Sequence, residues 1–345
     1  MRIRLCYIGV PLPFTLCMGF CGGLPLSGVE QEEGTLSFVR RQIGKRAMSI
    51  EAKPFLKWAG GKGQLLSQLV AHLPEVVGKE PFTYIEPFVG GGAMLFYMLQ
   101  HFCNIRKAVI NDVNEDLILT YRAIRDDVEK LIKKLSLMEN DYLAIASQEK
   151  RSLMFYDIRE QYNLHNGDGI TRAAQLIFLN KTCFNGLYRV NGKGLFNVPF
   201  GRYANPTICN EPLLRADSRL LQQVNIEICQ GDYSQTISFA EGLTFVYLDP
   251  PYRPLDATSS FTAYAKGNFN DDDQRQLADF CHQLNDKGCY WMESNADCSA
   301  KNPEDRFFEE LYKEYHIVRV NAARFINANA SKRGKLTELL IKNYE

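Results

Sequence analysis

The sequence predicts an α/β fold built on a doubly wound, mostly parallel sheet. Short β-prone runs alternate with helical stretches along most of the 345 residues, a pattern typical of βαβ units. Polar residues directly follow several of the β-prone runs, at the edge of such a sheet where ligands bind. The composition, 46% apolar and 23% charged, is that of an ordinary globular protein with one large domain or two smaller ones.

The first predicted unit is a strand at residues 82–86, followed by a glycine-rich turn at 87–92 and a helix at 93–100. A strand, a glycine-rich turn and a helix, in this order, open a nucleotide-binding βαβ unit. This unit therefore predicts where the ligand edge of the sheet lies.

The middle of the chain predicts a mainly helical insertion into the sheet. A second strand is expected at 107–110, with Asn111-Asp112 directly after it. The periodicity that follows predicts a helix over 116–134. Residues 125–180 are expected to be mostly helical. At 181–205 turn residues, aromatic residues and bases replace the helical periodicity.

The remaining elements complete the sheet. They are expected as strands at 225–229, 243–248 and 288–292, a helix at 271–284, and a closing antiparallel pair at 316–320 and 336–341. This order predicts three regions after the amino-terminal 47 residues: a first part of the sheet domain at 48–122, the insertion at 123–222 and a second part at 223–345.

The formal net charge is zero, with 40 lysines and arginines against 40 aspartates and glutamates. This balance excludes a histone-like basic coat and an acidic disordered chain, but a neutral total can contain a local basic stripe. Residues 180–203 form such a stripe, with four bases, no acid and interleaved aromatic residues. A second basic run at 324–335 is a candidate for phosphate contacts.

The ten cysteines include no CxxC pair, and no histidines cluster with them. We therefore expect neither a disulfide scaffold nor a zinc site, and assign no metal to the protein. Reduced, mostly buried thiols favour a cytoplasmic location.

Residues 1–47 differ from the rest of the chain. An apolar stretch at 5–26 follows two arginines, which superficially resembles a secretory signal. Pro11, Pro13 and Pro25 argue against a spanning helix, and Met48 begins a segment typical of a natural start. We expect 1–47 to be a translated extension with no role in the fold, with an export signal as the alternative, and no membrane segment elsewhere.

The glycine-rich turn predicts a particular kind of cofactor. Gly90 and its neighbours let a ligand approach the free amides at a helix start, and Asp112, at the end of the next strand, suits the ribose hydroxyls of an adenosine ligand. Glu86 stands where a phosphate binder would disfavour negative charge. The pattern favours S-adenosylmethionine, with a purely structural turn as the alternative.

The second motif, Asp249-Pro250-Pro251-Tyr252, follows a buried β-prone run. The prolines lack N–H donors and hold the backbone rigidly, so a carboxylate and a free carbonyl are presented together. Two acceptors side by side suit the two hydrogens of an exocyclic amino group, and Tyr252 can stack on the face of the base.

Together these motifs resemble the Dam family of DNA adenine-N6 methyltransferases, in its alpha group and D12 class. The resemblance covers residues 53–345. In chain order, it rests on a cofactor motif at 53–63 (KPFLKWAGGKG), a glycine motif at 84–93 (YIEPFVGGGA), the acidic pair Asn111-Asp112, a target-reading segment at 180–203 and the catalytic motif at 249–252.

The resemblance implies a Rossmann-like, S-adenosylmethionine-dependent catalytic sheet with an inserted target-recognition domain. It implies cofactor contacts by Trp58, Lys62, Glu86, Gly90, Asp112, Asp232 and Asp249. It further implies that Asp249 and the Pro250 carbonyl accept hydrogen bonds from a flipped-out adenine, on which Tyr252 stacks. The methyl group then moves directly, with no covalent enzyme intermediate and no metal.

The resemblance also implies that the 180–203 segment reads double-stranded DNA. The implied contacts are Lys181, Phe184, Asn185, Leu187, Arg189, Pro199, Arg202 and Tyr203. In this assignment Arg189 reads the first guanine, Leu187 and Pro199 contact thymine, and Phe184 and Asn185 fill the gap left by the flipped base. The match favours 5′-GATC-3′ as the target, with a longer site that begins with GAT as the alternative.

Two other functions compete with this hypothesis. One is a methyltransferase acting on another amino group, cytosine N4 or an adenine in RNA, and the other is a catalytically silent DNA-binding regulator. A cognate restriction endonuclease is a candidate partner. The sequence leaves open whether the protein has such a partner or acts alone.

Overall fold

The computed structural model describes residues 50–58, 60–254, 269–322 and 336–345. The chain divides into two units, Met1–Glu51 and Ala52–Glu345, and the description that follows concerns the second unit. The predicted extension at 1–47 and the basic run at 324–335 lie outside the described residues.

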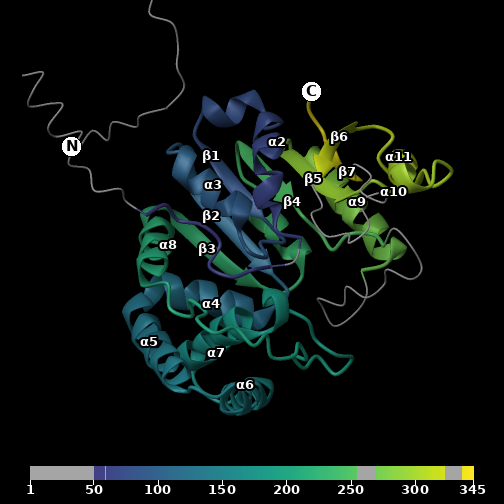
Figure 1. Cartoon of the computed structure of the whole chain (residues 1–345). Coiled ribbons are helices and arrows are strands. Elements are labelled where there is room, and N and C mark those ends of the chain that lie inside the picture. Colours follow the sequence, from purple (N-terminus) through teal and green to yellow (C-terminus); the bar gives the residue numbers. More distant parts are fainter. Residues whose placement is uncertain (1–49, 59, 255–268, 323–335) are drawn as a thin grey trace, which may run out of the picture. The chain divides into compact units, whose positions relative to one another are not determined.

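A seven-stranded sheet forms the centre of this unit (Figure 1). Its strands are β1 (Phe82–Glu86), β2 (Ile105–Asp112), β3 (Asn225–Gln230), β4 (Thr244–Leu248), β5 (Tyr290–Ala296), β6 (His316–Ala322) and β7 (Leu336–Lys342). The order across the sheet is β3-β2-β1-β4-β5-β7-β6. The first five strands pair in parallel, whereas β7 pairs antiparallel with β5 and β6. The predicted α/β class and closing antiparallel pair are confirmed.

Both faces of the sheet are covered, because successive side chains of a strand point to opposite sides. In β1, Tyr84 belongs to one buried cluster and Ile85 to the other. The Tyr84 cluster includes apolar residues of α3 (Ala93–His101), α4 (Glu115–Asp126) and α7 (Gly169–Thr182). The Ile85 cluster includes Leu277 and Phe280 of α9 (Asp271–Asp286). This two-sided burial is the doubly wound arrangement that the sequence predicts.

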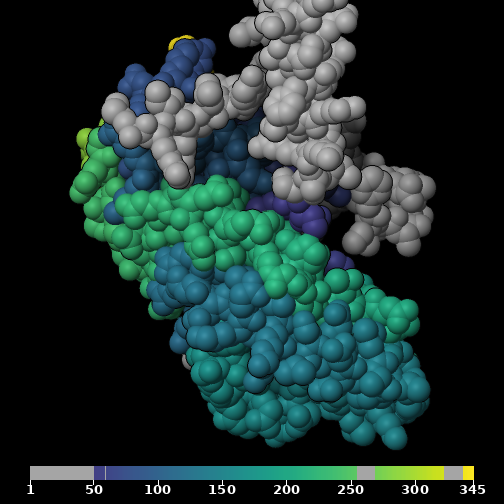
Figure 2. All heavy atoms as spheres, turned by 90° about the vertical axis from the view of Figure 1, so that its left-hand side faces the viewer, coloured from purple at the N-terminus to yellow at the C-terminus, as the bar shows by residue number. Residues whose placement is uncertain are grey.

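Four of the helices between β2 and β3 begin at side chains that cap their free amides. Asn114, Ser147, Asp168 and Asn210 each accept a hydrogen bond from a backbone N–H of the first turn. They start α4, α6 (Gln148–Asn163), α7 and α8 (Glu211–Gln223) respectively. In Figure 2 the blue and teal residues of this helical region cover the lower part of the face shown.

Three predicted boundaries differ from the structure. The single helix expected at 116–134 is two helices, α4 and α5 (Val128–Ala144), because the backbone of Asp127 leaves the helical region at φ −136° and ψ 38°. The break lets both helices pack on α7. Strand β2 is longer than predicted, since its pairing with β3 continues to Asp112. Strand β5 begins at Tyr290 and reaches Ala296, because pairing with β7 holds its polar end in the sheet.

The short elements complete the unit. They are α2 (Leu66–Ala71), α10 (Cys298–Lys301), α11 (Phe307–Leu311) and four 3-10 helices: η1 (Lys62–Gln64), η2 (Glu75–Gly78), η3 (Phe184–Gly186) and η4 (Tyr233–Phe239). Two isolated antiparallel bridges, Cys183 with Phe200 and Val190 with Phe196, fold the 180–203 segment back on itself.

Candidate active site and nucleic-acid interface

The strand order reverses direction between β1 and β4, which pair in parallel with Ile85 opposite Val246. At such a switch point the two following loops diverge and leave a crevice at the carboxyl ends of the strands. The glycine-rich turn follows β1 and Asp249 follows β4. The fold therefore brings the two predicted motifs, which are far apart in sequence, to one edge of the sheet.

Lys62 and Asp249 form an ion pair at this edge. Nζ of Lys62 lies 2.9 Å from Oδ1 of Asp249, and the lysine side chain is only 5% exposed. The hydroxyl of Ser294 donates to the same Oδ1 at 2.9 Å. Burial raises the pKa of Asp249, while Lys62 and the Ser294 hydrogen bond act in the opposite direction. No described residue bonds the second oxygen, Oδ2, which is left as an acceptor.

Tyr252 and Glu338 extend this cluster. The Tyr252 hydroxyl donates to Oε2 of Glu338 at 2.6 Å, and Nζ of Lys62 lies 3.7 Å from the same oxygen. The Lys62 ammonium also lies 4.2 Å from the centre of the Tyr252 ring, within the range of a cation–π interaction. Burial, followed by the charge of Asp249, raises the pKa of Tyr252 well above its ordinary value. One lysine thus orients a carboxylate and an aromatic ring together.

Asp112 is fixed beside the glycine turn. Its Oδ2 accepts from the Gly90 N–H at 3.1 Å and its Oδ1 accepts from the Asn114 N–H at 2.9 Å. Burial raises the pKa of Asp112, and these backbone donors partly offset the shift. Each oxygen has further lone pairs, so the carboxylate can still accept hydrogen bonds from a diol.

Trp58 packs against the glycine turn. Gly90 has a positive φ of 48°, and a Cβ added there would meet Cδ1 of Trp58 at 3.0 Å. A Cβ at Gly91 would lie 3.1 Å from Cβ of Trp58. The turn therefore needs glycine both for its backbone conformation and for the close approach of the indole.

Glu86 and Asp232 occupy different environments along the same edge. Glu86 is 2% exposed and accepts a hydrogen bond from the Tyr84 hydroxyl at 2.7 Å. Burial raises its pKa well above the ordinary value. Asp232 is exposed and caps η4 by accepting from the Ser234 N–H at 2.9 Å. It follows Gly231, whose N–H donates to the backbone carbonyl of Asp112 at 3.1 Å.

The 180–203 segment alternates exposed and buried side chains. Leu187 and Arg189 are exposed, whereas Tyr188, which lies between them, and Val190, which follows Arg189, are buried. The exposed members predicted to contact DNA are Phe184, Asn185, Leu187, Arg189, Pro199 and Arg202. Phe184 is 52% exposed and Leu187 is 38% exposed, so both apolar side chains are accessible to a binding partner.

Several contacts hold the segment in place. Nε of Arg189 donates to Oδ1 of Asn197 at 2.7 Å, which leaves other guanidinium donors free. The carbonyl of Tyr203 accepts from the Tyr142 hydroxyl at 2.8 Å. Lys181 is half-buried, and burial lowers its pKa.

The carboxamide of Asn180 ties the start of this segment to Lys57, next to Trp58. The Lys57 N–H donates to Oδ1 of Asn180 at 3.0 Å, and Nδ2 of Asn180 donates to the carbonyls of Lys57 at 2.9 Å and Gly186 at 3.0 Å. The 180–203 segment is therefore attached directly to the residues that flank the glycine turn.

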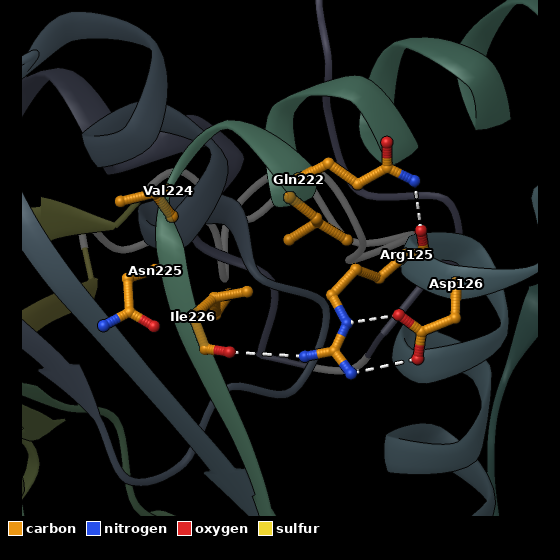
Figure 3. A pocket seen from close by; sticks show the side chains of 7 residues that line it. Arg125, Asp126, Gln222, Val224, Asn225 and Ile226 are labelled. Atoms are coloured by element: carbon orange, nitrogen blue, oxygen red, sulfur yellow. Dashed lines mark hydrogen bonds and ion pairs between the residues drawn. The ribbon is translucent and has the colours of Figure 1, made fainter.

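A separate hollow lies at the amino end of β3, on the opposite edge of the sheet (Figure 3). Arg125 spans it, with Nε 2.7 Å from Oδ1 of Asp126 and Nη1 donating to the carbonyl of Ile226 at 3.2 Å. These polar groups bond one another and lie far from the motif residues, so we assign no ligand to this hollow.

Comparison with known proteins identifies the family. A family model described as D12 class N6 adenine-specific DNA methyltransferase matches residues 58–326. The chain belongs to this family of methyltransferases. The expected resemblance and the enzyme class are confirmed, and Lys62, Asp249 and Tyr252 lie within the matched residues.

Three curated relatives illustrate the similarity. The type II methyltransferase M.MjaIII of Methanocaldococcus jannaschii is 48% identical over 299 residues, covering 86% of this chain and all of the relative. The type II methyltransferase M1.LlaDCHI of Lactococcus lactis subsp. cremoris is 38% identical over 86% of this chain and 96% of its own. The DNA adenine methylase of Escherichia coli K12 is 31% identical over 84% and 94% of the two chains.

Three residues of this methyltransferase site escaped the sequence analysis. Glu338 is the one acid in β7, next to a run of three apolar residues, and an acid beside such a run is the signal that would have found it. Ser294 lies in a run of polar residues at the end of β5 and is fully buried. Tyr188 stacks on Trp58 with ring centres 4.8 Å apart, a contact between distant segments that only the fold reveals.

Among the described residues, no helix is long and apolar enough to cross a membrane.

Proposed function

We propose that this methyltransferase transfers the methyl group of S-adenosylmethionine to N6 of adenine within 5′-GATC-3′ in duplex DNA. The observation that carries the proposal is the Lys62–Asp249 ion pair at 2.9 Å, in contact with Tyr252 and located at the sheet switch point. It places an oriented acceptor beside an aromatic ring. That combination suits an adenine held by its amino group and its face.

The residues along the edge fit the cofactor. Asp112 retains acceptor capacity for ribose hydroxyls beside the Gly90 amide, and Trp58 packs against the same glycine turn. The carboxyl groups of Glu86 and Asp249 would repel phosphates but are compatible with a sulfonium cation. The bound cofactor supplies an activated methyl group. Asp232 lies at the end of β3, where we propose that it borders the cofactor's adenine.

The catalytic motif would act on a flipped base. Removing adenine from the stack costs a few kcal/mol, and we propose that Phe184 and Asn185 fill the gap that it leaves. Oδ2 of Asp249 and the Pro250 carbonyl then accept from the amino group, while Tyr252 stacks on the ring. These hydrogen bonds orient the nitrogen lone pair towards the methyl group. Lys62 holds Asp249 in place, so the gain in rate comes from positioning and electrostatics.

We propose that the helical insertion at 123–222 is the target-recognition domain. The exposed Arg189 guanidinium, held by Asn197, suits the O6 and N7 acceptors of guanine. Leu187 and Pro199 suit the thymine methyl group. Lys181, Arg202 and Tyr203 would contact the flanking backbone, where bases provide salt-dependent affinity. Family membership favours adenine in DNA over cytosine N4 or RNA. The assembled Lys62, Asp112 and Asp249 favour an enzyme over a silent regulator.

The test is methyl transfer to defined duplexes. Purified protein, radiolabelled S-adenosylmethionine and a duplex with one GATC site should give N6-methyladenine, and a plasmid should become resistant to an endonuclease blocked by GATC methylation. Asp249→Ala should bind the duplex and lose turnover, whereas Asp272→Ala, an exposed site on α9, should retain it. Methyl incorporation at another sequence would refute the target, and full turnover by Asp249→Ala would refute the role of that residue.

We also propose a restriction endonuclease as the partner of this methyltransferase. The two relatives named type II methyltransferases are 48% and 38% identical to this chain, against 31% for the DNA adenine methylase of Escherichia coli. These names support a restriction endonuclease reading the same site as the partner. Cleavage of unmethylated GATC plasmid by the product of an adjacent gene, and its absence after treatment with this enzyme, would establish that pairing.

A further inference from the structure

Two aromatic rings join the cofactor side of the site to the 180–203 segment. Trp58 and Tyr188 stack with ring centres 4.8 Å apart and planes at 23°. Tyr188 is 6% exposed, although both of its chain neighbours are exposed. The two residues come from separate parts of the chain, so this stack is a direct contact between two functional regions.

The glycine turn also approaches the Trp58 ring system closely. A Cβ at Gly90 would lie 3.0 Å from Cδ1 and 3.2 Å from Nε1 of the indole. The Gly90 amide is also the donor to Asp112. A ligand bound to Asp112 and the turn therefore restricts the position of the indole, because protein interiors leave little room for independent movement.

Tyr188 in turn determines where its neighbours point. Side chains alternate across extended backbone, so burying the Tyr188 ring projects Leu187 and Arg189 outward on the same side. Phe196 packs on the ring from within the segment, with centres 5.8 Å apart. The ring is therefore held between the body of the segment and Trp58.

We propose that Tyr188 is a positioning residue for target reading, and that its stack on Trp58 couples a filled cofactor site to the placement of Leu187 and Arg189. This inference rests on the proposed function, since it assumes a cofactor at the glycine turn and DNA at the 180–203 segment. It adds a specificity-determining residue that touches neither ligand in that assignment.

The coupling has a thermodynamic consequence. If the cofactor and the correct DNA favour the same arrangement of the two rings, each tightens the binding of the other by the same factor. The effect should be greatest for a duplex whose first guanine reaches Arg189. It should be smaller for a duplex with another base at that position.

The experiment measures this factor with the full-length protein. Fluorescence anisotropy gives the affinity for a labelled GATC duplex, and for one with the first guanine replaced, with and without saturating S-adenosylhomocysteine. The wild-type protein should bind the GATC duplex about fivefold or more tighter with S-adenosylhomocysteine present. Tyr188→Phe keeps the stacked ring and should retain that factor, whereas Tyr188→Leu should lose it, together with the preference for the first guanine.

A matched variant separates coupling from general loosening of the segment. Phe196→Leu removes a buried ring that also packs on Tyr188 but leaves the Trp58 stack intact, and it should preserve the coupling factor. Thermal unfolding monitored by circular dichroism confirms that each variant is folded. Equal loss of coupling in Phe196→Leu, or full coupling in a folded Tyr188→Leu, overturns the inference.

Failure of the proposed function gives a different result. If the wild-type protein binds neither S-adenosylhomocysteine nor the GATC duplex, the proposed function fails. If it binds both, but each affinity is independent of the other ligand, the proposed function stands and the role of Tyr188 is overturned.

Discussion

Nζ of Lys62 lies 2.9 Å from Oδ1 of Asp249, although the two residues belong to motifs that are far apart in the sequence. The lysine is almost fully buried, and its charge is shared with Glu338 at 3.7 Å. A buried cation between two carboxylates compensates charges that would otherwise repel each other in a medium of low polarity. Lys62 therefore orients Asp249 and Tyr252 of the proposed catalytic motif from outside that motif.

Replacing Lys62 by methionine should reduce turnover on the order of a hundredfold. The pKa of Asp249, already raised by burial, would rise further without the cation, so the carboxylate would be protonated more often at neutral pH. The residual rate should consequently increase with pH. Single-turnover methylation rates across the pH range measure both effects. Lys79→Met removes an exposed ion pair with Glu75 and should change neither, and an equal loss in both variants would contradict the assignment.

We expect Glu338 to support turnover through the hydrogen bond that it accepts from Tyr252 at 2.6 Å. Glu338→Ala removes the acceptor, frees the aromatic ring and should lower kcat about tenfold, as expected for loss of one positioning contact. Glu338→Gln retains an acceptor oxygen and should preserve most of the activity. Steady-state kcat and KM for a GATC duplex distinguish the two variants. Similar losses for alanine and glutamine would indicate that charge, and not the hydrogen bond, is important.

Gly90→Ala should weaken both the fold and cofactor binding. The residue has φ +48°, and its Cβ would meet Trp58 at 3.0 Å, so we expect a destabilisation of about 1–2 kcal/mol. The displaced indole should also reduce the affinity for S-adenosylhomocysteine. Chemical denaturation and calorimetric titration measure these effects. Gly78→Ala, where a Cβ would have no heavy atom within 4 Å, is the control and should affect neither.

Arg189→Ala should reduce discrimination at the first guanine by about 1–3 kcal/mol, the value of one good bidentate contact. Binding of S-adenosylhomocysteine should be unchanged, because the side chain is exposed on the 180–203 segment. The readout is the ratio of kcat/KM for GATC and for a duplex with that guanine replaced. Asn197→Ala frees the guanidinium from its 2.7 Å hydrogen bond and should cause a smaller loss. Unchanged discrimination in Arg189→Ala would exclude it as the reader of guanine.

Glu293 should make stability depend on pH. Burial raises its pKa from 4.5 to about 7, despite hydrogen bonds from Tyr312 and Asn295. Between these values the folded state holds a proton that the unfolded state releases, so the free energy of unfolding falls as pH rises from about 4.5 to about 7, and then levels. The contribution is roughly 3 kcal/mol.

Glu293→Gln should remove that slope, because glutamine resembles the protonated acid. Denaturant unfolding at several pH values compares the variant with wild type and with Glu80→Gln, which replaces an exposed carboxyl group. Parallel pH profiles for wild type and Glu293→Gln would show that the buried group does not titrate in this range.

The class of fold and the location of the motifs could be predicted from the residues alone. Alternation of β-prone and helical runs predicts the parallel sheet from local sequence. Gly90, Asp112 and Asp249 stand at or just after the carboxyl ends of predicted strands. Since these ends share one edge of a parallel sheet, the three residues are expected at the same edge. The pattern also indicated the 180–203 segment, where bases and aromatic residues replace helical periodicity.

Which side chains come into contact depends on how distant segments of the chain pack together. Glu338 reaches Tyr252 because β7 inserts antiparallel beside β5. Tyr188 reaches Trp58 because Asn180 holds the start of the 180–203 segment against Lys57. The helix break at Asp127 likewise depends on packing against α7. Local periodicity reports which face of an element is buried, but pairing, charge compensation and burial of polar groups depend on residues distant in the chain.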